Sequence, residues 1–289
     1  MTRCFFISDL HGRIERYDKL FGIILMERPD IVLLGGDLLP HGIRFASSQH
    51  SEQPEFIDGF LAPRLERLKS RLSEDYPRIL VILGNDDPRN FEPDFITLQD
   101  TGLIEYVHNR RITLGMFEIY GYSCVPPTPF MLKDWERYDV SRYVNPGCIS
   151  PEEGVKSVHT PEWERRLCTI KDDLNKLTQN ADLTNAVFLF HSPPYQTKLD
   201  HAVLDGRLVD HVPLDDHVGS ISIRRLIEAR QPLLTLHGHI HESTRLTGDW
   251  RDRIGRTWCF NAAYDGSELS LIRFSLEKPE EASRELIRT

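Results

Sequence analysis

Short apolar runs alternate with segments of helical periodicity along most of the chain. The runs 4–7 and 31–34 are apolar without interruption, as is typical of strands buried on both faces, and the residues between them keep a helical spacing. Strands that are connected through helices are generally parallel neighbours in one sheet. We expect helices over about 13–27, 56–72, 162–177 and 220–229. We expect strands at 4–7, 31–34, 79–83, 116–121, 187–190, 233–236, 257–260 and 269–274.

Residues 122–164 break this pattern. The segment is rich in proline, aromatic and charged residues and lacks clean periodicity. Long segments without regular structure are uncommon in compact domains and often cover binding sites. We therefore expect one domain over residues 1–289, with an insertion around 122–164 whose Phe130, Trp135 and Tyr138 line a substrate pocket. The alternative is an insertion that is only packed on the surface.

Charge and cysteine usage narrow the class of protein. The net charge is -9 and acidic residues are spread along the chain, which disfavours a surface that grips nucleic-acid phosphates. The five cysteines are widely spaced without a C-x-x-C pair, so reduced thiols are expected. Residues 3–8 already form a predicted core strand, which leaves no room for a signal peptide, and no apolar run is long enough to span a membrane. We expect a soluble cytoplasmic protein without membrane association, and its oligomeric state stays open.

Residue types that bind metals follow five of the predicted strands, at the point where each strand ends. They are Asp9 and His11, Asp37, Asn85, His191, and His239 with His241. In open sheets, ligands bind beyond the carboxyl ends of parallel strands, so these side chains can converge on one crevice. The alternative, in which each residue only caps its own turn, leaves the choice of aspartate, histidine and asparagine unexplained.

The composition of this set indicates its chemistry. Seven ligands are too many for one tetrahedral zinc ion, and a mixture of imidazole, carboxylate and amide oxygen suits two borderline ions. Two ions ~3.5–4 Å apart activate water and hold the oxygens of a phosphoryl group during displacement. The pattern therefore predicts hydrolysis of a phosphate ester.

The motifs D-x-H, G-D, G-N, a histidine at a strand end and G-H-x-H, in this order over residues 9–241, resemble the calcineurin-like metallophosphoesterase superfamily, in particular its uncharacterised microbial members. The resemblance implies an α/β fold, a four-layer α/β/β/α sandwich. It also implies two divalent transition-metal ions (manganese, iron or zinc) and attack by a metal-bridging hydroxide. In that scheme one ion is held by Asp9, His11 and His241, the other by Asn85, His191 and His239, and Asp37 bridges them.

Asp86 departs from the commonest family pattern. Many members have histidine after G-N, where it is thought to assist the leaving group, whereas this chain has an aspartate. A carboxylate donates protons poorly at neutral pH and repels a dianionic monoester more than a monoanionic diester, which favours phosphodiesters or activated esters. The alternative is that Asp86 turns away and caps the following turn. We expect Asn85, Asp86 and His239 to be catalytic and Arg89 to bind the phosphate, although a solvent-facing arginine is an alternative.

The prediction is thus a metal-dependent hydrolase of a small phosphate ester, favouring phosphodiesters. A phosphomonoesterase or protein serine/threonine phosphatase is the second enzyme hypothesis. A non-catalytic scaffold with this fold is the hypothesis from another class, but such proteins typically lose ligands, and here every ligand position is filled.

His237 is expected to be a core residue or to orient a ligand. His201, His211 and His217 follow no buried strand, so we expect solvated loop histidines there.

Overall fold

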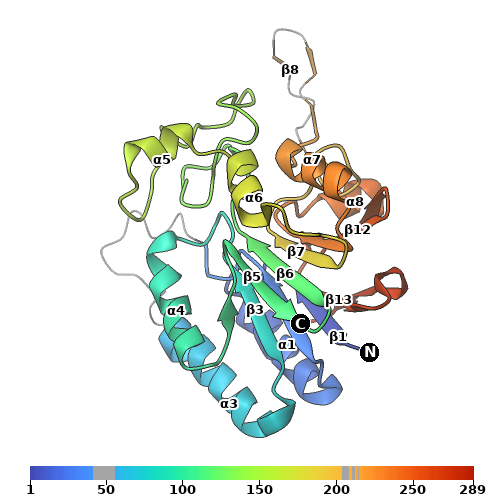
Figure 1. Ribbon diagram of the computed structural model, residues 1–289. Coiled ribbons are helices and arrows are strands. Elements are labelled where there is room, and N and C mark those ends of the chain that lie inside the picture. Colours follow the sequence, from blue (N-terminus) through green and yellow to red (C-terminus); the bar gives the residue numbers. More distant parts are fainter. Residues whose placement is uncertain (42–55, 204–207, 210–211, 214) are drawn as a thin grey trace.

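The computed structural model describes residues 1–41, 56–203, 208–209, 212–213 and 215–289. Within them, two six-stranded sheets lie between layers of helices, and one pair of short strands stands apart (Figure 1). The loop histidine His211 lies outside the described residues.

The first sheet has the strand order β14-β13-β1-β2-β3-β4. Its strands are β1 (Arg3–Ile7), β2 (Ile31–Gly35), β3 (Arg78–Ile82), β4 (Glu105–Tyr106), β13 (Leu269–Ser275) and β14 (Ser283–Ile287). Neighbours from β1 to β4 are parallel, whereas β13 runs antiparallel to both β1 and β14. The carboxyl ends of β1, β2 and β3 therefore meet at one edge.

The second sheet has the order β11-β12-β10-β7-β6-β5. Its strands are β5 (Arg110–Leu114), β6 (Phe117–Tyr122), β7 (Ala186–Phe190), β10 (Leu234–His237), β11 (Arg251–Ile254) and β12 (Thr257–Asn261). The four central strands β6, β7, β10 and β12 are parallel, and the edge strands β5 and β11 are antiparallel to their neighbours. The short strands β8 (Leu208–Val209) and β9 (Val212–Pro213) pair with each other.

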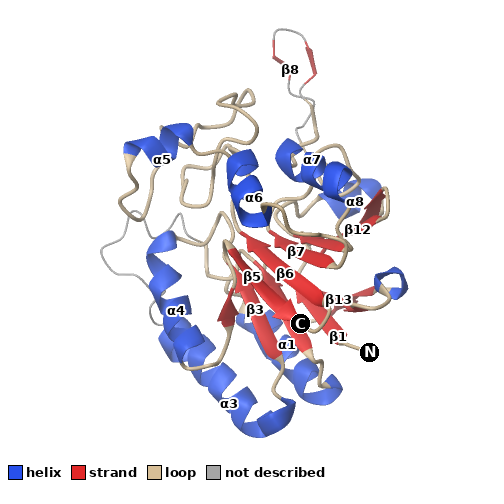
Figure 2. Cartoon of the chain, in the orientation of Figure 1, coloured by secondary structure: helices blue, strands red, loops and turns tan. Residues whose placement is uncertain are grey.

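Helices cover the outer face of each sheet (Figure 2). On the side of the first sheet they are α1 (Ile14–Glu27), the π-helical turn η2 (Ile57–Leu61), α3 (Ala62–Leu72), η3 (Ser73–Asp75), η4 (Arg89–Phe91) and α4 (Glu92–Asp100). On the other side they are α6 (Ile170–Thr178), α7 (Ile221–Arg230) and α8 (Ser243–Thr247). The remaining helices are α5 (Glu162–Leu167) at the end of the insertion and η5 (Pro279–Glu281) before β14. Among the described residues, no helix combines the length and apolar character needed to cross a membrane.

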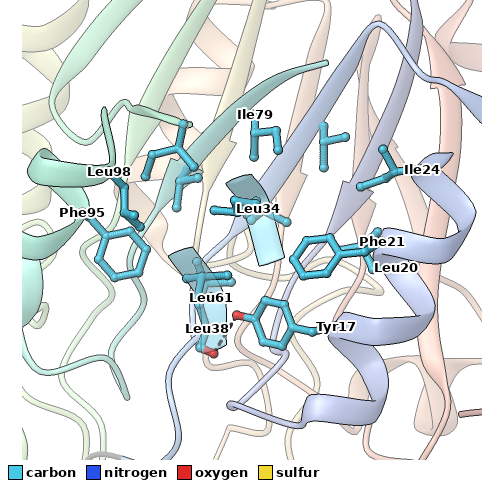
Figure 3. Close-up of a pocket in the computed structure, with 14 residues that line it drawn as sticks. Tyr17, Leu20, Phe21, Ile24, Leu34, Leu38, Leu61, Ile79, Phe95 and Leu98 are labelled. Carbon is cyan, nitrogen blue, oxygen red and sulfur yellow. Dashed lines mark hydrogen bonds between the residues drawn. The ribbon is translucent and has the colours of Figure 1, made fainter. Parts of the chain in front are cut away.

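The uninterrupted apolar strands explain the layers, because alternate residues face opposite sides. In β1, Cys4 and Phe6 belong to the apolar cluster between the two sheets, whereas Phe5 and Ile7 belong to the cluster that contains the helices. Figure 3 shows the helix side, where Tyr17 and Phe21 of α1 and Phe95 of α4 pack over the first sheet. The predicted four-layer α/β/β/α sandwich is confirmed.

Two of the differences from the predicted elements concern the insertion and the helix that follows it. The helix expected over 162–177 is two helices, α5 and α6, because the Thr169 side chain accepts a hydrogen bond from the backbone N of Asp172 (3.1 Å) and begins a new helix. The insertion contains little regular structure, yet it is packed: Trp135 and Tyr138 are 1% and 3% exposed. Their rings are therefore not open to a ligand, whereas Phe130 is 51% exposed.

Candidate metal centre

The structure brings together the seven ligand-type residues that follow β1, β2, β3, β7 and β10. The loops themselves are joined by backbone hydrogen bonds: the N–H of Asp9 donates to the carbonyl of Gly36 and the N–H of His11 to that of Asp37, at 2.9 and 2.8 Å. Across the two sheets, His191 Nδ1 donates to the carbonyl of Gly35 at 2.7 Å. The edges of both sheets thus meet at one site.

The first group consists of Asp9, His11 and His241, with Asp37 beside them. His241 Nε2 lies 3.0 Å from Asp9 Oδ1 and 3.2 Å from His11 Nε2. Ligand atoms ~2.1 Å from one ion and at right angles to each other lie ~3 Å apart, so these separations fit a shared cation.

The second group consists of Asn85, His191 and His239, again with Asp37. His191 Nε2 lies 3.0 Å from Asn85 Oδ1 and 3.3 Å from Asp37 Oδ1. The other carboxylate oxygen of Asp37, Oδ2, lies 4.0 Å from His11 Nε2 in the first group. One carboxylate therefore faces both groups with different oxygens, and this donor set fits two divalent ions that share Asp37.

The ring nitrogens of the histidines differ in their surroundings. Because His191 Nδ1 donates to a backbone carbonyl, its Nε2 is the nitrogen left for a metal. His11 Nδ1 is buried without a hydrogen bond among the described residues, and the nearest acidic atom is Asp86 Oδ2 at 3.3 Å. His237 uses both nitrogens, toward the Ser192 carbonyl and Thr235 Oγ1, and is completely buried. His237 is thus a core residue and not a ligand.

Four of the seven residues have a left-handed backbone. The φ angles are 59° for Asp9, 47° for His11, 53° for Asp37 and 69° for His239. Such conformations are uncommon outside glycine and cost of order 1–3 kcal/mol each, and they concentrate at functional sites. Their clustering here points to selection for the position of the side chains rather than for stability.

Two glycines make room for the ligands. A Cβ on Gly84 would collide with Asp37 Oδ1 and His191 Nε2, and a Cβ on Gly238 would collide with Asp9 Oδ2. The glycine before Asn85 and the glycine before His239 are therefore required by close approach of side chains from other strands.

The buried ionisable side chains of the site shift one another's pKa values. Burial alone would raise the pKa of Asp37, but the neighbouring His191 holds it below its usual value. Burial alone would lower the pKa of His191, and the charge of Asp37 instead raises it to about 9. Burial, reinforced by the charge of His191, lowers the pKa of His239 to about 3, so its imidazole is neutral and suited to metal binding.

Asp87 is a supporting residue that the sequence analysis missed. It is completely buried, and its carboxylate accepts hydrogen bonds from the backbone N–H groups of Leu38, Leu39 and Gly84 at 2.8–3.1 Å. It thereby joins the loop of Asp37 to the loop of Asn85. Burial, together with the charge of Asp37, raises the pKa of Asp87 to about 7. The signal available in the sequence was a second aspartate directly after Asp86, in a loop that follows a buried strand.

Asp86 faces the first ligand group, and its neighbour His41 was also missed. The Asp86 backbone N–H donates to Asp37 Oδ1 at 2.8 Å, and its Oδ2 accepts from His41 Nδ1 at 2.6 Å. The His41 ring stacks on His11 with centroids 4.8 Å apart, and its side chain is 64% exposed. An exposed imidazole therefore covers the rim of the centre, four residues after Asp37 in the sequence.

Arg89 lies outside this constellation. Its guanidinium pairs with Glu92 at 3.2 Å and Glu164 at 3.6 Å, and it stacks on the Trp135 ring. In the described part of the chain, no hydrogen bond or ion pair links it to the seven ligand-type residues. The contacts of Arg89 are those of a residue that anchors the insertion.

Comparisons with known proteins agree with this geometry. The model of the calcineurin-like phosphoesterase family matches residues 2–243. Among curated proteins there is no match. The protein TT1561 of Thermus thermophilus has a similar structure, with a TM-score of 0.57 at 16% identity over 99% of each chain. A dimetal phosphatase from Danio rerio is 10% identical over 94% of this chain and 91% of its own, with a TM-score of 0.49.

At such identities the solved structures show the fold alone, and the second likeness is too weak to carry an argument. The family match is different in kind, since it covers most of the chain and includes all seven residues of the site. This chain belongs to the calcineurin-like phosphoesterase family.

Proposed function

We propose that this protein hydrolyses a small phosphate ester with two divalent transition-metal ions, and that phosphodiesters are its preferred class. The observation that carries the proposal is the shared carboxylate of Asp37, which faces two groups of ligand-type side chains at once. Two ions bound there would lower the pKa of a water molecule and offset the charge of the phosphoryl oxygens. Imidazoles dominate the ligand set, which favours manganese, iron or zinc over magnesium.

The chain's own residues divide the remaining work. Asn85 turns Oδ1 toward His191, so its amide N–H₂ is the group left to donate to a phosphoryl oxygen. His239 is fixed by its backbone, because its N–H donates to both carboxylate oxygens of Asp9 at 3.1 and 3.3 Å. We assign catalytic roles to Asn85 and His239 on these contacts.

Asp86 supports the preference for diesters. Its carboxylate lies 3.3 Å from His11 Nδ1 and is 17% exposed, so its negative charge stands at the rim where a substrate would enter. A dianionic monoester meets more repulsion there than a monoanionic diester. The charge of Asp86 therefore selects between the two substrate classes.

A second candidate function, a phosphomonoesterase, rests on His41. Asp86, which stands in the sequence where many family members have a histidine after G-N, holds this imidazole at the rim by a hydrogen bond. An imidazole at this place can contact the departing oxygen of a poor leaving group, which monoesters of alcohols require. The scaffold hypothesis finds no support, because all seven ligand positions are filled and four of the seven residues have a left-handed backbone.

The test is a panel of matched phosphate monoesters and diesters, assayed with added manganese, iron or zinc. We expect hydrolysis that depends on metal, with diesters above the corresponding monoesters. Activity on monoesters alone would support the second candidate. Metal-independent activity, or none on any member of a broad panel with metal bound, would contradict the proposal.

A further inference from the structure

A second group of histidines lies outside the site described above. His201 and His217 face each other as an antiparallel bridge in the segment between β7 and α7, where the chain leads to and from the strand pair β8 and β9. Their rings are 4.1 Å apart between centroids. The flanking backbone closes the bridge, since Ala202 N–H donates to the Asp216 carbonyl and Val218 N–H to the Asp200 carbonyl.

Each imidazole is held by a carboxylate. His201 Nδ1 lies 2.9 Å from Asp216 Oδ2, and His217 Nδ1 lies 2.9 Å from Asp200 Oδ1. Because His217 Nδ1 donates to Asp200, its Nε2 carries the free lone pair, and a carboxylate in this place is the usual support of a histidine that binds metal. The 2.9 Å between His201 Nδ1 and Asp216 Oδ2 is instead the separation expected of two ligand atoms on one ion. These contacts across an isolated bridge are more than two solvated loop histidines require.

Asp200 is fixed independently of any ion. It is completely buried, and it also accepts hydrogen bonds from the backbone N–H groups of Gln196, Thr197 and Gly219 at 2.8–3.1 Å. The His217 ring is therefore hydrogen-bonded to a carboxylate whose position the backbone already fixes. Tyr195 packs against the same ring, with centroids 5.9 Å apart.

Three side chains at this bridge lie close enough together to bind one cation. His201, Asp216 and His217 each offer a ligand atom, and these atoms lie within 4.8 Å of one another. The side chains are 27%, 54% and 22% exposed, so an ion can reach them from solvent. Imidazoles with one carboxylate suit a late first-row divalent ion such as zinc, with water completing the shell.

We propose that His201, His217 and Asp216 form a separate site for one zinc-type ion, which fastens the two chain segments at the base of the β8–β9 pair. This site is independent of the proposed phosphoesterase chemistry, because it shares no residue with the strand-end centre. Its effect is structural: an ion bound to both sides of the bridge restrains the segments against separating.

The experiment counts zinc in the full-length protein. The metal-free chain is equilibrated with buffered zinc sulfate, and bound zinc is measured by elemental analysis for the parent, His217→Ala and, as a control, His159→Ala at an exposed position. We expect His217→Ala to bind one ion fewer than the parent and to lose at least about 100-fold in affinity for that ion. We expect the control to match the parent.

A second variant and a second readout protect the test against a folding defect. Asp216→Ala removes an exposed side chain and should also weaken the extra ion, with an unchanged circular dichroism spectrum. Zinc should slow hydrogen exchange at the amides of Ala202 and Val218 in the parent and not in either variant. Equal zinc content in the parent and both variants, or exchange that zinc leaves unchanged, would overturn the proposal.

Discussion

Asp37 is the residue that can join the two groups of ligand-type side chains into one dinuclear centre. Its two carboxylate oxygens face different ligand groups, and the side chain is only 4% exposed. An amide has the same shape but one oxygen fewer and no charge, so it cannot serve two cations equally.

Asp37→Asn should therefore lower kcat/KM by more than about 100-fold while the protein stays folded, because the residue belongs to the site and not to the apolar core. Steady-state kinetics with excess metal and a thermal melt measure both effects. Near-parent activity at saturating metal would show that the bridging role is wrong.

Variants of Asp86 and His41 separate charge repulsion of the substrate from assistance to the leaving group. Asp86→Asn removes charge at the rim, so it should raise the ratio of monoester to diester hydrolysis for nitrophenyl substrates, whose leaving group needs no help. His41→Ala should leave that ratio unchanged and should slow esters with poor leaving groups, by about 100-fold relative to nitrophenyl esters. A ratio that Asp86→Asn does not alter, in protein that binds both metals, would remove the electrostatic basis for diester preference.

His108 provides a prediction for acid stability. Burial, with the nearby charges of Arg89 and Arg137, lowers the pKa of His108 from 6.5 to about 3. As pH falls below about 6.5, the unfolded chain binds a proton that the folded chain does not, so stability is lost through this window, at up to ~1.4 kcal/mol per pH unit.

The measurement is the free energy of unfolding in urea between about pH 6.5 and pH 5. His108→Gln should flatten its pH dependence relative to the parent, whereas His159→Gln, at an exposed position, should leave the slope as it is. The slope, and not the absolute stability, is the criterion, because replacing His108 also costs packing. An unchanged slope in His108→Gln would mean that His108 is protonated in the folded protein.

At the scale of elements, the insertion is fastened to the metal-binding loops. Trp135 Nε1 donates to the Asp87 carbonyl at 2.8 Å, and the Asp134 carboxylate accepts from the Arg89 backbone N–H at 2.8 Å. The aromatic residue that the sequence offered as a substrate contact is instead a structural anchor.

Trp135→Ala should cost about 3–5 kcal/mol of stability, because the ring is 1% exposed and its N–H is satisfied inside the protein. Trp163→Ala in the same insertion removes a ring that is 61% exposed and should change stability by less than about 0.5 kcal/mol. Urea unfolding of both variants compares them directly. Similar stability of the two would mean that Trp135 does not anchor the insertion.

The central elements were predictable because their signals are local. Doubly buried strands such as β2 and β7 are apolar without interruption, and the strand-end residues follow them directly. The edge strands β5, β11 and β14 were not predicted, since an exposed edge keeps its polar residues and loses the apolar signal. The helix boundary at Thr169 was missed because a cap depends on one hydrogen bond that a periodic pattern does not report.

At the scale of the whole molecule, the candidate site arises from two sheets that meet at their carboxyl ends. The sequence could name the seven ligand-type residues from their position after each strand. It could not show that His41 reaches Asp86 or that His201 reaches His217, because those contacts depend on how loops fold back in space. Arg89 was a reasonable candidate for binding phosphate by residue type and spacing, but its guanidinium forms ion pairs with Glu92 and Glu164.

The most direct test of the account is a manganese titration of the metal-free protein, followed by electron paramagnetic resonance and by hydrolysis of a nitrophenyl diester. His201→Ala with His217→Ala serves as the background, so that the proposed third ion does not enter the count. The account predicts that hydrolysis rises with the second equivalent, together with the spectrum of two coupled ions that share Asp37. Full activity with one bound ion, or two ions without coupling, would contradict it.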